Sequence, residues 1–197
     1  MINTTLPQSN TAPACTALGS GVWLAFRHIA GTSAPAVPPP AAGAHLLSVE
    51  FCRRGRHALP AGDYCTIAAD GHAAVSMTAA GADDYYPGAV YEGLQFWIDP
   101  DAQTGSGFLA LMGLDVHGII NYFCASGPYY CPMGDDLAAL VDELWREFDV
   151  SGYASPGELR YAVVRLLYML LQLPYADQMA WYPRAQVDLV RDAETLM

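Results

Sequence analysis

The stretch Val90–Asp99, with the sequence VYEGLQFWID, decides the fold class of this 197-residue chain. Apolar side chains alternate there with polar, small or aromatic ones: Leu94, Phe96 and Ile98 against Tyr91, Gly93, Gln95 and Trp97. Successive side chains of a β-strand point to opposite faces of the sheet, so the alternation predicts a strand with two different faces. One face suits a hydrophobic core, and the other combines hydrogen-bonding groups with aromatic rings.

Earlier stretches of the chain repeat this pattern. In Leu46–Cys52, one face carries Leu47, Val49 and Phe51, and the other carries Ser48, Glu50 and Cys52. Val22–His28 alternates in the same way. Shorter strand-like pieces follow, and turn residues separate them: Tyr64–Ala68 and Ala73–Thr78, with turns at Gly55, Pro60–Asp63, Asp70–Gly71 and Pro87–Gly88. Several short strands at about ten-residue spacing predict a β-sandwich or a small barrel.

The periodicity becomes helical after residue 134. Residues 136–149 place apolar side chains on one stripe, and Asp135 or Asp136 is the expected N-cap. A second helix, over residues 156–173, follows the sequence Ser155-Pro-Gly-Glu158, which is typical of a capping box. Two amphipathic or apolar helices therefore follow the strands.

The second helix is apolar almost all round between Ala162 and Leu171. Such a helix needs packing partners on two sides, so it is either the central helix of a monomer or a seam between two protomers. The dimerisation candidates on this helix are Tyr161, Val164, Leu167, Tyr168 and Leu171. A third helical stretch, within residues 182–197, stops without a C-cap, which is typical of a chain that ends inside a linker.

The composition excludes several classes of partner. The formal net charge is −11, and all nine basic residues are arginines, so the chain lacks the clustered positive charge that binds nucleic acid or an anionic membrane. Five cysteines without a Cys-x-x-Cys pair indicate reduced thiols in a cytoplasmic protein. Met1–Asn10 does not resemble a signal peptide, and the apolar run Tyr161–Leu173 is too short to span a bilayer.

No enzymatic motif is present in the sequence. The five histidines lack the local spacing of a metal site, and there is no nucleophile elbow or phosphate-binding glycine loop. We therefore expect no catalytic residues, no metal and no cofactor.

The polar faces of the predicted strands remain as a candidate ligand site. Glu50 and Gln95 supply hydrogen-bonding groups, and Tyr91 and Trp97 supply aromatic walls, a combination that suits a small polar ligand inside a small β-barrel. The alternative is that this face meets solvent, with the Leu47, Phe51 and Phe96 face as the core.

Several short motifs resemble those of AraC-type transcriptional regulators in their order and spacing. They are LSVEFCRRGR at Leu47–Arg56, Tyr86-Pro87, Tyr91-Glu-Gly93 and Ile98-Asp99, followed by the helix pair 136–149 and 156–173 and a linker-like segment from Tyr182 to Met197. The family's two helix-turn-helix motifs would follow residue 197.

The resemblance implies an α+β module. Residues 1–20 would form a flexible arm, 21–130 a cupin-like, jelly-roll β-barrel that binds a small-molecule effector, 135–175 a helical dimerisation segment, and 182–197 the start of a linker. The module would be a homodimer that contacts DNA only through a domain outside this chain. Two alternatives remain. A cupin-like sugar isomerase or epimerase requires a metal or a histidine–carboxylate dyad inside the barrel. A structural interaction module requires an interior filled by large side chains.

Overall fold

The α+β class is confirmed. A computed structural model describes residues 15–31, 33–35, 45–79, 83–149, 155–173 and 180–196. The strands within them are β1 (Cys15–Gly19), β2 (Val22–Ala30), β3 (Ser33–Pro35), β4 (His45–Ala61), β5 (Tyr64–Ala69), β6 (His72–Ala79), β7 (Asp83–Tyr85), β8 (Val90–Ile98), β9 (Tyr129–Pro132) and β10 (Tyr182–Pro183). The helices are α1 (Phe108–Leu111), α2 (Val116–Phe123), α3 (Gly134–Leu144), α4 (Pro156–Leu170) and α5 (Arg184–Thr195).

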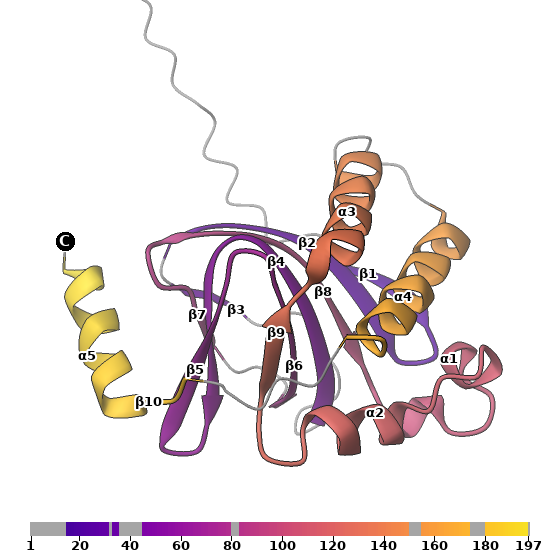
Figure 1. Ribbon diagram of the computed structural model, residues 1–197, viewed down its shortest axis with the longest axis horizontal. Helices are drawn as coiled ribbons and strands as arrows, with labels where there is room; N and C mark the ends of the chain where they lie inside the picture. The colour runs from indigo at the N-terminus through magenta and orange to yellow at the C-terminus, as the bar shows by residue number, and fades with distance from the viewer. Residues whose placement is uncertain are drawn as a thin grey trace, which may run out of the picture.

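The long strand β4 belongs to two antiparallel sheets. Its first half lies in the larger sheet, in the order β1-β2-β8-β4-β6-β9. Its second half lies in the smaller sheet, in the order β10-β5-β4-β7-β3. No pairing among the described strands joins the ends of either sheet, so the structure shows an open, curved sheet rather than the predicted closed barrel (Figure 1).

β4 continues through Gly55, where the sequence analysis predicted a turn. The register between β4 and β8 shifts between Cys52 and Arg54, which is a β-bulge. Gly55 has φ +94°, and a Cβ there would lie 2.0 Å from the carbonyl oxygen of Val90. Glycine is required because only a residue without a side chain fits this approach. The turn prediction was wrong because a glycine bulge and a glycine turn look alike in sequence.

One face of the larger sheet, the helix-side face, carries the main hydrophobic core. Its buried strand residues include Val22, Leu24, Leu47, Val49, Phe51, Leu94, Phe96 and Ile98. Side chains from all of α1–α4 pack against them, and α3 and α4 contact each other (Figure 1). The alternation of β8 and β4 therefore placed this face in the core correctly.

The helices refine two predictions. α4 has the expected capping box, in which the Ser155 amide donates to the Glu158 carboxylate at 2.7 Å and the Glu158 amide donates to the Ser155 hydroxyl at 3.2 Å. α3 is preceded by Met133, so Asp135 and Asp136 lie in its first turn and the predicted aspartate N-cap was wrong. The short helices α1 and α2 were not predicted.

Two of the five dimerisation candidates belong to the core of a single protomer. Leu167 is 0% exposed and Val164 is buried beside it, so neither side chain is available to a second copy. Tyr161, Tyr168 and Leu171 are exposed on the other side of α4. The apolar character of this helix arises mainly from burial within the protomer.

At the N-terminal end the structure differs from the sequence prediction, whereas at the C-terminal end the predicted third helix is present as α5. Cys15–Gly19 is a strand that pairs with β2, so this part of residues 1–20 is not a flexible arm; residues 1–14 lie outside the described residues. At the other end, β10 pairs with β5, and α5 lies across the molecule from α3 and α4 (Figure 1). Within the described ranges, no helix is long and apolar enough to cross a membrane.

Candidate ligand site

The second face of the larger sheet, the inner face, is buried as well. The cross-strand register places Glu50 beside Gln95 and Ser48 beside Trp97. The smaller sheet covers this face, since Leu59 of β4 and Ala68 of β5 pack with Ala74 of β6. The inner face is therefore interior and does not meet solvent, because β4 carries a second sheet across it.

Polar side chains gather on the inner face. We name them the interior polar cluster: Arg27, Ser48, Glu50, His57, Tyr91 and Gln95, each at most 3% exposed. Buried polar groups destabilise a fold unless they find partners, so a cluster of this size needs either internal hydrogen bonds or a bound molecule.

Glu50 and His57 form a hydrogen-bonded pair at the centre of the cluster. The imidazole Nδ1 of His57 lies 2.5 Å from Oε2 of Glu50, a distance at which the ring N–H donates to the carboxylate. Both side chains are almost completely buried. The carboxylate thus fixes the orientation of the imidazole ring within the interior.

A second set of hydrogen bonds crosses the strands. Arg27 donates from Nη1 to Oε1 of Gln95 at 2.7 Å, and Gln95 donates from Nε2 to the hydroxyl of Ser48 at 2.9 Å. The Arg27 guanidinium also lies 5.3 Å from the ring centroid of Tyr86 and 6.0 Å from that of Trp97. These contacts hold a fully buried cation by hydrogen bonding and by cation–π attraction.

Aromatic rings enclose the Glu50–His57 pair. The ring of Tyr86 stacks on His57 with centroids 4.7 Å apart and planes 17° apart. Tyr91 packs edge-on against His57 at 6.1 Å and lies 4.8 Å from Tyr86. Burial holds the pKa of Tyr91 well above its usual value, and the nearby Glu50 carboxylate raises it further, so the phenol stays protonated and can donate.

Oε1 of Glu50 and the hydroxyl of Tyr91 are buried atoms without a hydrogen bond of normal geometry among the described residues, although the two side chains lie close enough for Glu50 to raise the pKa of Tyr91. A buried carboxylate oxygen left without a donor costs at least about 1–3 kcal/mol relative to a satisfied one. One atom accepts and the other can both accept and donate. A ligand hydroxyl group could donate to the Glu50 carboxylate or accept from the Tyr91 hydroxyl.

The structure brings together the four predicted ligand residues, Glu50, Tyr91, Gln95 and Trp97. Glu50, Gln95 and Trp97 lie on neighbouring strands of the inner face, and Tyr91 joins Glu50 through His57. The sequence analysis did not propose Arg27, His57 and Tyr86. Strand alternation places Arg27 on the same face as Ala25, whereas His57 follows Gly55, which we had interpreted as a turn.

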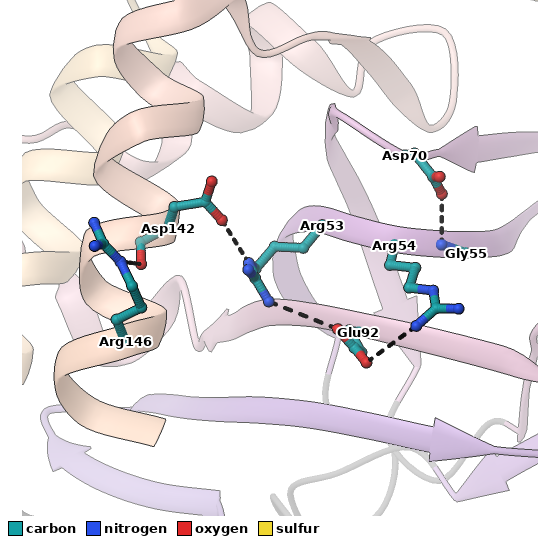
Figure 2. Close-up of polar contacts among 7 residues, drawn as sticks. All are labelled: Arg53, Arg54, Gly55, Asp70, Glu92, Asp142 and Arg146. Atoms are coloured by element: carbon teal, nitrogen blue, oxygen red, sulfur yellow. Dashed lines mark hydrogen bonds and ion pairs between the residues drawn. The ribbon is translucent and has the colours of Figure 1, made fainter. Parts of the chain in front are cut away.

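Arg53 points from the β4 bulge to the helix side. Its Nε donates to Asp142 of α3 at 2.7 Å, and Nη1 lies 3.7 Å from Glu92 of β8 (Figure 2). Its guanidinium lies 4.6 Å from the Trp145 ring centroid. The bulge therefore connects the strand that carries Glu50 and His57 to α3.

No group of three or more His, Cys, Asp or Glu side chains within the described residues is arranged to hold a metal ion. Within the interior polar cluster, the carboxylate of Glu50 pairs with the imidazole of His57. What this part of the chain offers a ligand is therefore hydrogen bonding, aromatic contact and one buried carboxylate.

Comparisons with known proteins give a fold relationship. No family model matches the sequence, and no curated protein matches it. Among solved structures, the AraC-like transcriptional activator CuxR superposes with a TM-score of 0.51 at 13% identity, covering 84% of this chain and 57% of that chain. This chain thus spans less than two thirds of CuxR, and at this identity the match concerns the fold alone. The fold of this chain is similar to that of an AraC-like transcriptional activator, in agreement with the family that its sequence motifs resemble.

Proposed function

We infer that this chain is the effector-binding and dimerisation module of a transcription regulator, and that a small hydroxylated molecule binds at the interior polar cluster. The observation that carries this proposal is the buried Oε1 of Glu50, which has no hydrogen bond of normal geometry among the described residues. The fold similarity to an AraC-like activator supports the regulatory class.

The chemistry of the cluster suggests the class of ligand. Glu50 Oε1 accepts, the Tyr91 hydroxyl donates, and the rings of Tyr86 and Trp97 offer apolar surface nearby. A sugar, polyol or hydroxy acid combines hydroxyl groups with a partly apolar carbon skeleton. DNA contact belongs, in this proposal, to a separate domain, because the net charge of −11 disfavours phosphate binding here.

Dimerisation would use the exposed side of α4. Tyr161, Tyr168 and Leu171 are large apolar residues exposed there, at positions seven and three residues apart along the helix. Buried aromatic side chains commonly dominate the free energy of protein–protein contacts.

A thermal-shift screen tests the effector proposal. Wild-type protein is melted with sugars, polyols and hydroxy acids, and each hit is measured by calorimetry against Glu50→Gln. A ligand at 100 times its Kd stabilises by about 2.7 kcal/mol, which raises Tm by several degrees. We expect Glu50→Gln to weaken binding about tenfold or more, because a buried hydrogen bond to a charged group is lost. An unchanged Kd in Glu50→Gln and Tyr91→Phe would remove the cluster from the binding site.

The alternative is a cupin-like sugar-modifying enzyme. The observation in its favour is the buried Glu50–His57 dyad, because a carboxylate that holds one imidazole nitrogen orients the other for proton transfer. Incubating each hit with the protein and following its NMR spectrum separates the two functions. A change in the sugar that requires His57 would indicate catalysis, and an unchanged sugar would indicate an effector. A panel without any hit would favour the structural interaction module.

A further inference from the structure

Tyr85 and Tyr86 are adjacent residues that face opposite sides of the smaller sheet. Tyr86 points inward, where it is fully buried and stacks on His57. Tyr85 pairs with Ala58 of β4 and packs outward, in a small cluster with Ala58, Cys65 and Val187. Val187 belongs to α5. Adjacent residues of the chain therefore contact the interior polar cluster, through Tyr86, and the C-terminal helix, through Tyr85.

α5 is held mainly through this point. The Tyr85 hydroxyl donates to Oε2 of Glu194 at 2.8 Å, and the Gly88 amide donates to Oε1 of the same carboxylate at 3.2 Å. Arg191 places its guanidinium 5.9 Å from the Tyr85 ring centroid. Further along, the Arg184 amide donates to the carbonyl oxygen of Asp63 at 2.8 Å.

Few other side chains hold α5 in place. Val187 is its only buried residue, whereas Leu189 and Val190 are 71% and 50% exposed. An element with so little buried apolar surface opens at low free energy. A small change at Tyr85 or Glu194 is therefore sufficient to alter the docked fraction of α5.

The backbone around the two tyrosines is restricted. Pro87 disfavours a helical conformation at Tyr86, and the Ala89 amide donates to the carbonyl oxygen of Tyr86 at 3.2 Å. Gly88 and Ala89 both have positive φ, of +85° and +57°. Because the turn is constrained on one side and the Tyr86 ring is packed on the other, a shift of the Tyr86 ring moves the Tyr85 backbone.

We propose that the Tyr85–Tyr86 pair couples the interior polar cluster to the docking of α5. A molecule bound at Glu50 repositions His57, the stacked ring of Tyr86 follows, and Tyr85 changes its hold on Glu194. The proposal rests on the proposed function for the identity of the trigger. The coupling itself is a property of the protein without ligand, so it is measured independently.

Amide hydrogen exchange of the 197-residue chain tests the coupling. The exchange rate of the α5 amides is compared in wild type, in Tyr85→Phe, which removes the outer hydrogen bond, and in His57→Asn, which removes the inner stacking partner. Ser48→Ala is the matched control, because it removes a buried hydrogen bond of the same cluster, to Gln95, and leaves the ring of His57 stacked on Tyr86. We expect Tyr85→Phe and His57→Asn each to raise α5 exchange about fivefold, as the loss of one typical hydrogen bond does, and Ser48→Ala to leave it unchanged.

Coupling also predicts that the two effects are not independent. In the double variant His57→Asn/Tyr85→Phe, α5 exchange should rise less than the product of the single effects, because both act on one contact. If His57→Asn loses its cooperative melting transition, Glu50→Gln takes its place, since it weakens the hold on His57 with little change in volume.

The proposal is overturned if the interior variants leave α5 exchange at the wild-type rate, or if Ser48→Ala raises it equally. Independent effects in the double variant would also overturn it. A ligand that binds normally while α5 remains uncoupled would reject this inference and leave the proposed function intact. If the interior variants change α5 exchange but the protein binds no ligand of the panel, the coupling stands and the proposed function is rejected.

Discussion

The imidazole of His57 and the carboxylate of Glu50 meet at 2.5 Å although they are seven positions apart on the same strand. In a straight strand this separation would place their Cα atoms roughly 23 Å apart. Side chains of this size cannot span that distance, so the contact requires β4 to bend sharply between them. The bulge at Cys52–Arg54 and the positive φ of Gly55 provide the bend.

Gly55→Ala should therefore destabilise the protein strongly. The new Cβ would meet the Val90 carbonyl oxygen at 2.0 Å, and the left-handed backbone adds about 1–2 kcal/mol for a residue with a side chain. We expect a loss of at least about 3 kcal/mol in the free energy of unfolding, measured by urea denaturation. Gly62→Ala is the control, because Gly62 also has positive φ, of +60°, but a Cβ there meets nothing within 4 Å. Equal losses in the two variants would contradict the steric argument.

Arg53→Ala should loosen α3 from the sheet. It removes the hydrogen bond to Asp142, the ion pair with Glu92 and the stacking on Trp145. Since Arg53 is only 24% exposed, we expect a loss of about 1–2 kcal/mol by denaturation. Arg54→Ala is the control, because the Arg54 side chain is 66% exposed and lies 3.9 Å from Glu92. A loss in Arg54→Ala as large as that in Arg53→Ala would show that removing any positive charge beside Glu92 destabilises the protein, and that the contacts of Arg53 drawn in Figure 2 are not the cause.

Alkaline pH should weaken the hold of Tyr85 on α5. Burial and, after it, the hydrogen bond to Glu194 together raise the pKa of Tyr85 from the usual 10 to about 12. A pKa raised in the folded state means that the stabilisation is complete below pH 10 and is lost as the pH rises toward 12. The stability difference between wild type and Tyr85→Phe, measured by denaturation, should stay constant up to about pH 9 and then decrease. A difference that is independent of pH up to 12 would contradict this assignment.

Charge on the exposed side of α4 should dissociate the proposed dimer. Tyr168→Asp with Leu171→Asp should give a folded monomer with a Tm somewhat below that of the wild type, because both positions are exposed in the protomer but the Tyr168 hydroxyl loses its hydrogen bond to the Met112 carbonyl oxygen at 2.6 Å. Leu167→Asp should instead unfold the protein, since Leu167 is fully buried and an unpaired charge there costs several kcal/mol. Light scattering gives the mass and circular dichroism gives Tm. A dimer mass retained in the double variant would exclude this side of α4.

Much of the secondary structure followed from local patterns. Alternation identified β8 and the first half of β4, and the Ser155–Glu158 sequence identified the start of α4. The second half of β4 was missed, because its glycine suggested a turn. α1 and α2 were also missed, since helices of this length carry too few turns to show a clear period.

The candidate site was predictable in part. Glu50 and Gln95 share a face in any antiparallel pairing that buries Phe51 and Phe96, so alternation alone placed them together. His57 could not be added, because its position depends on the angle through which β4 bends. For the dimerisation candidates Val164 and Leu167, the apolar pattern predicted contact with a second protomer, whereas both side chains are buried within one protomer.

The sequence by itself determined which residues share a face, where the capped helix begins and which partners the charge of −11 disfavours, because periodicity, capping and net charge are local or additive properties. Only the tertiary structure decided that the polar face is interior, that Glu50 meets His57 and that Tyr85 and Tyr86 face opposite sides between the cluster and α5. These facts depend on one bend in β4 that folds the second sheet over the first. Contacts across the bend join residues that are distant along the strand, and local sequence patterns do not predict such contacts.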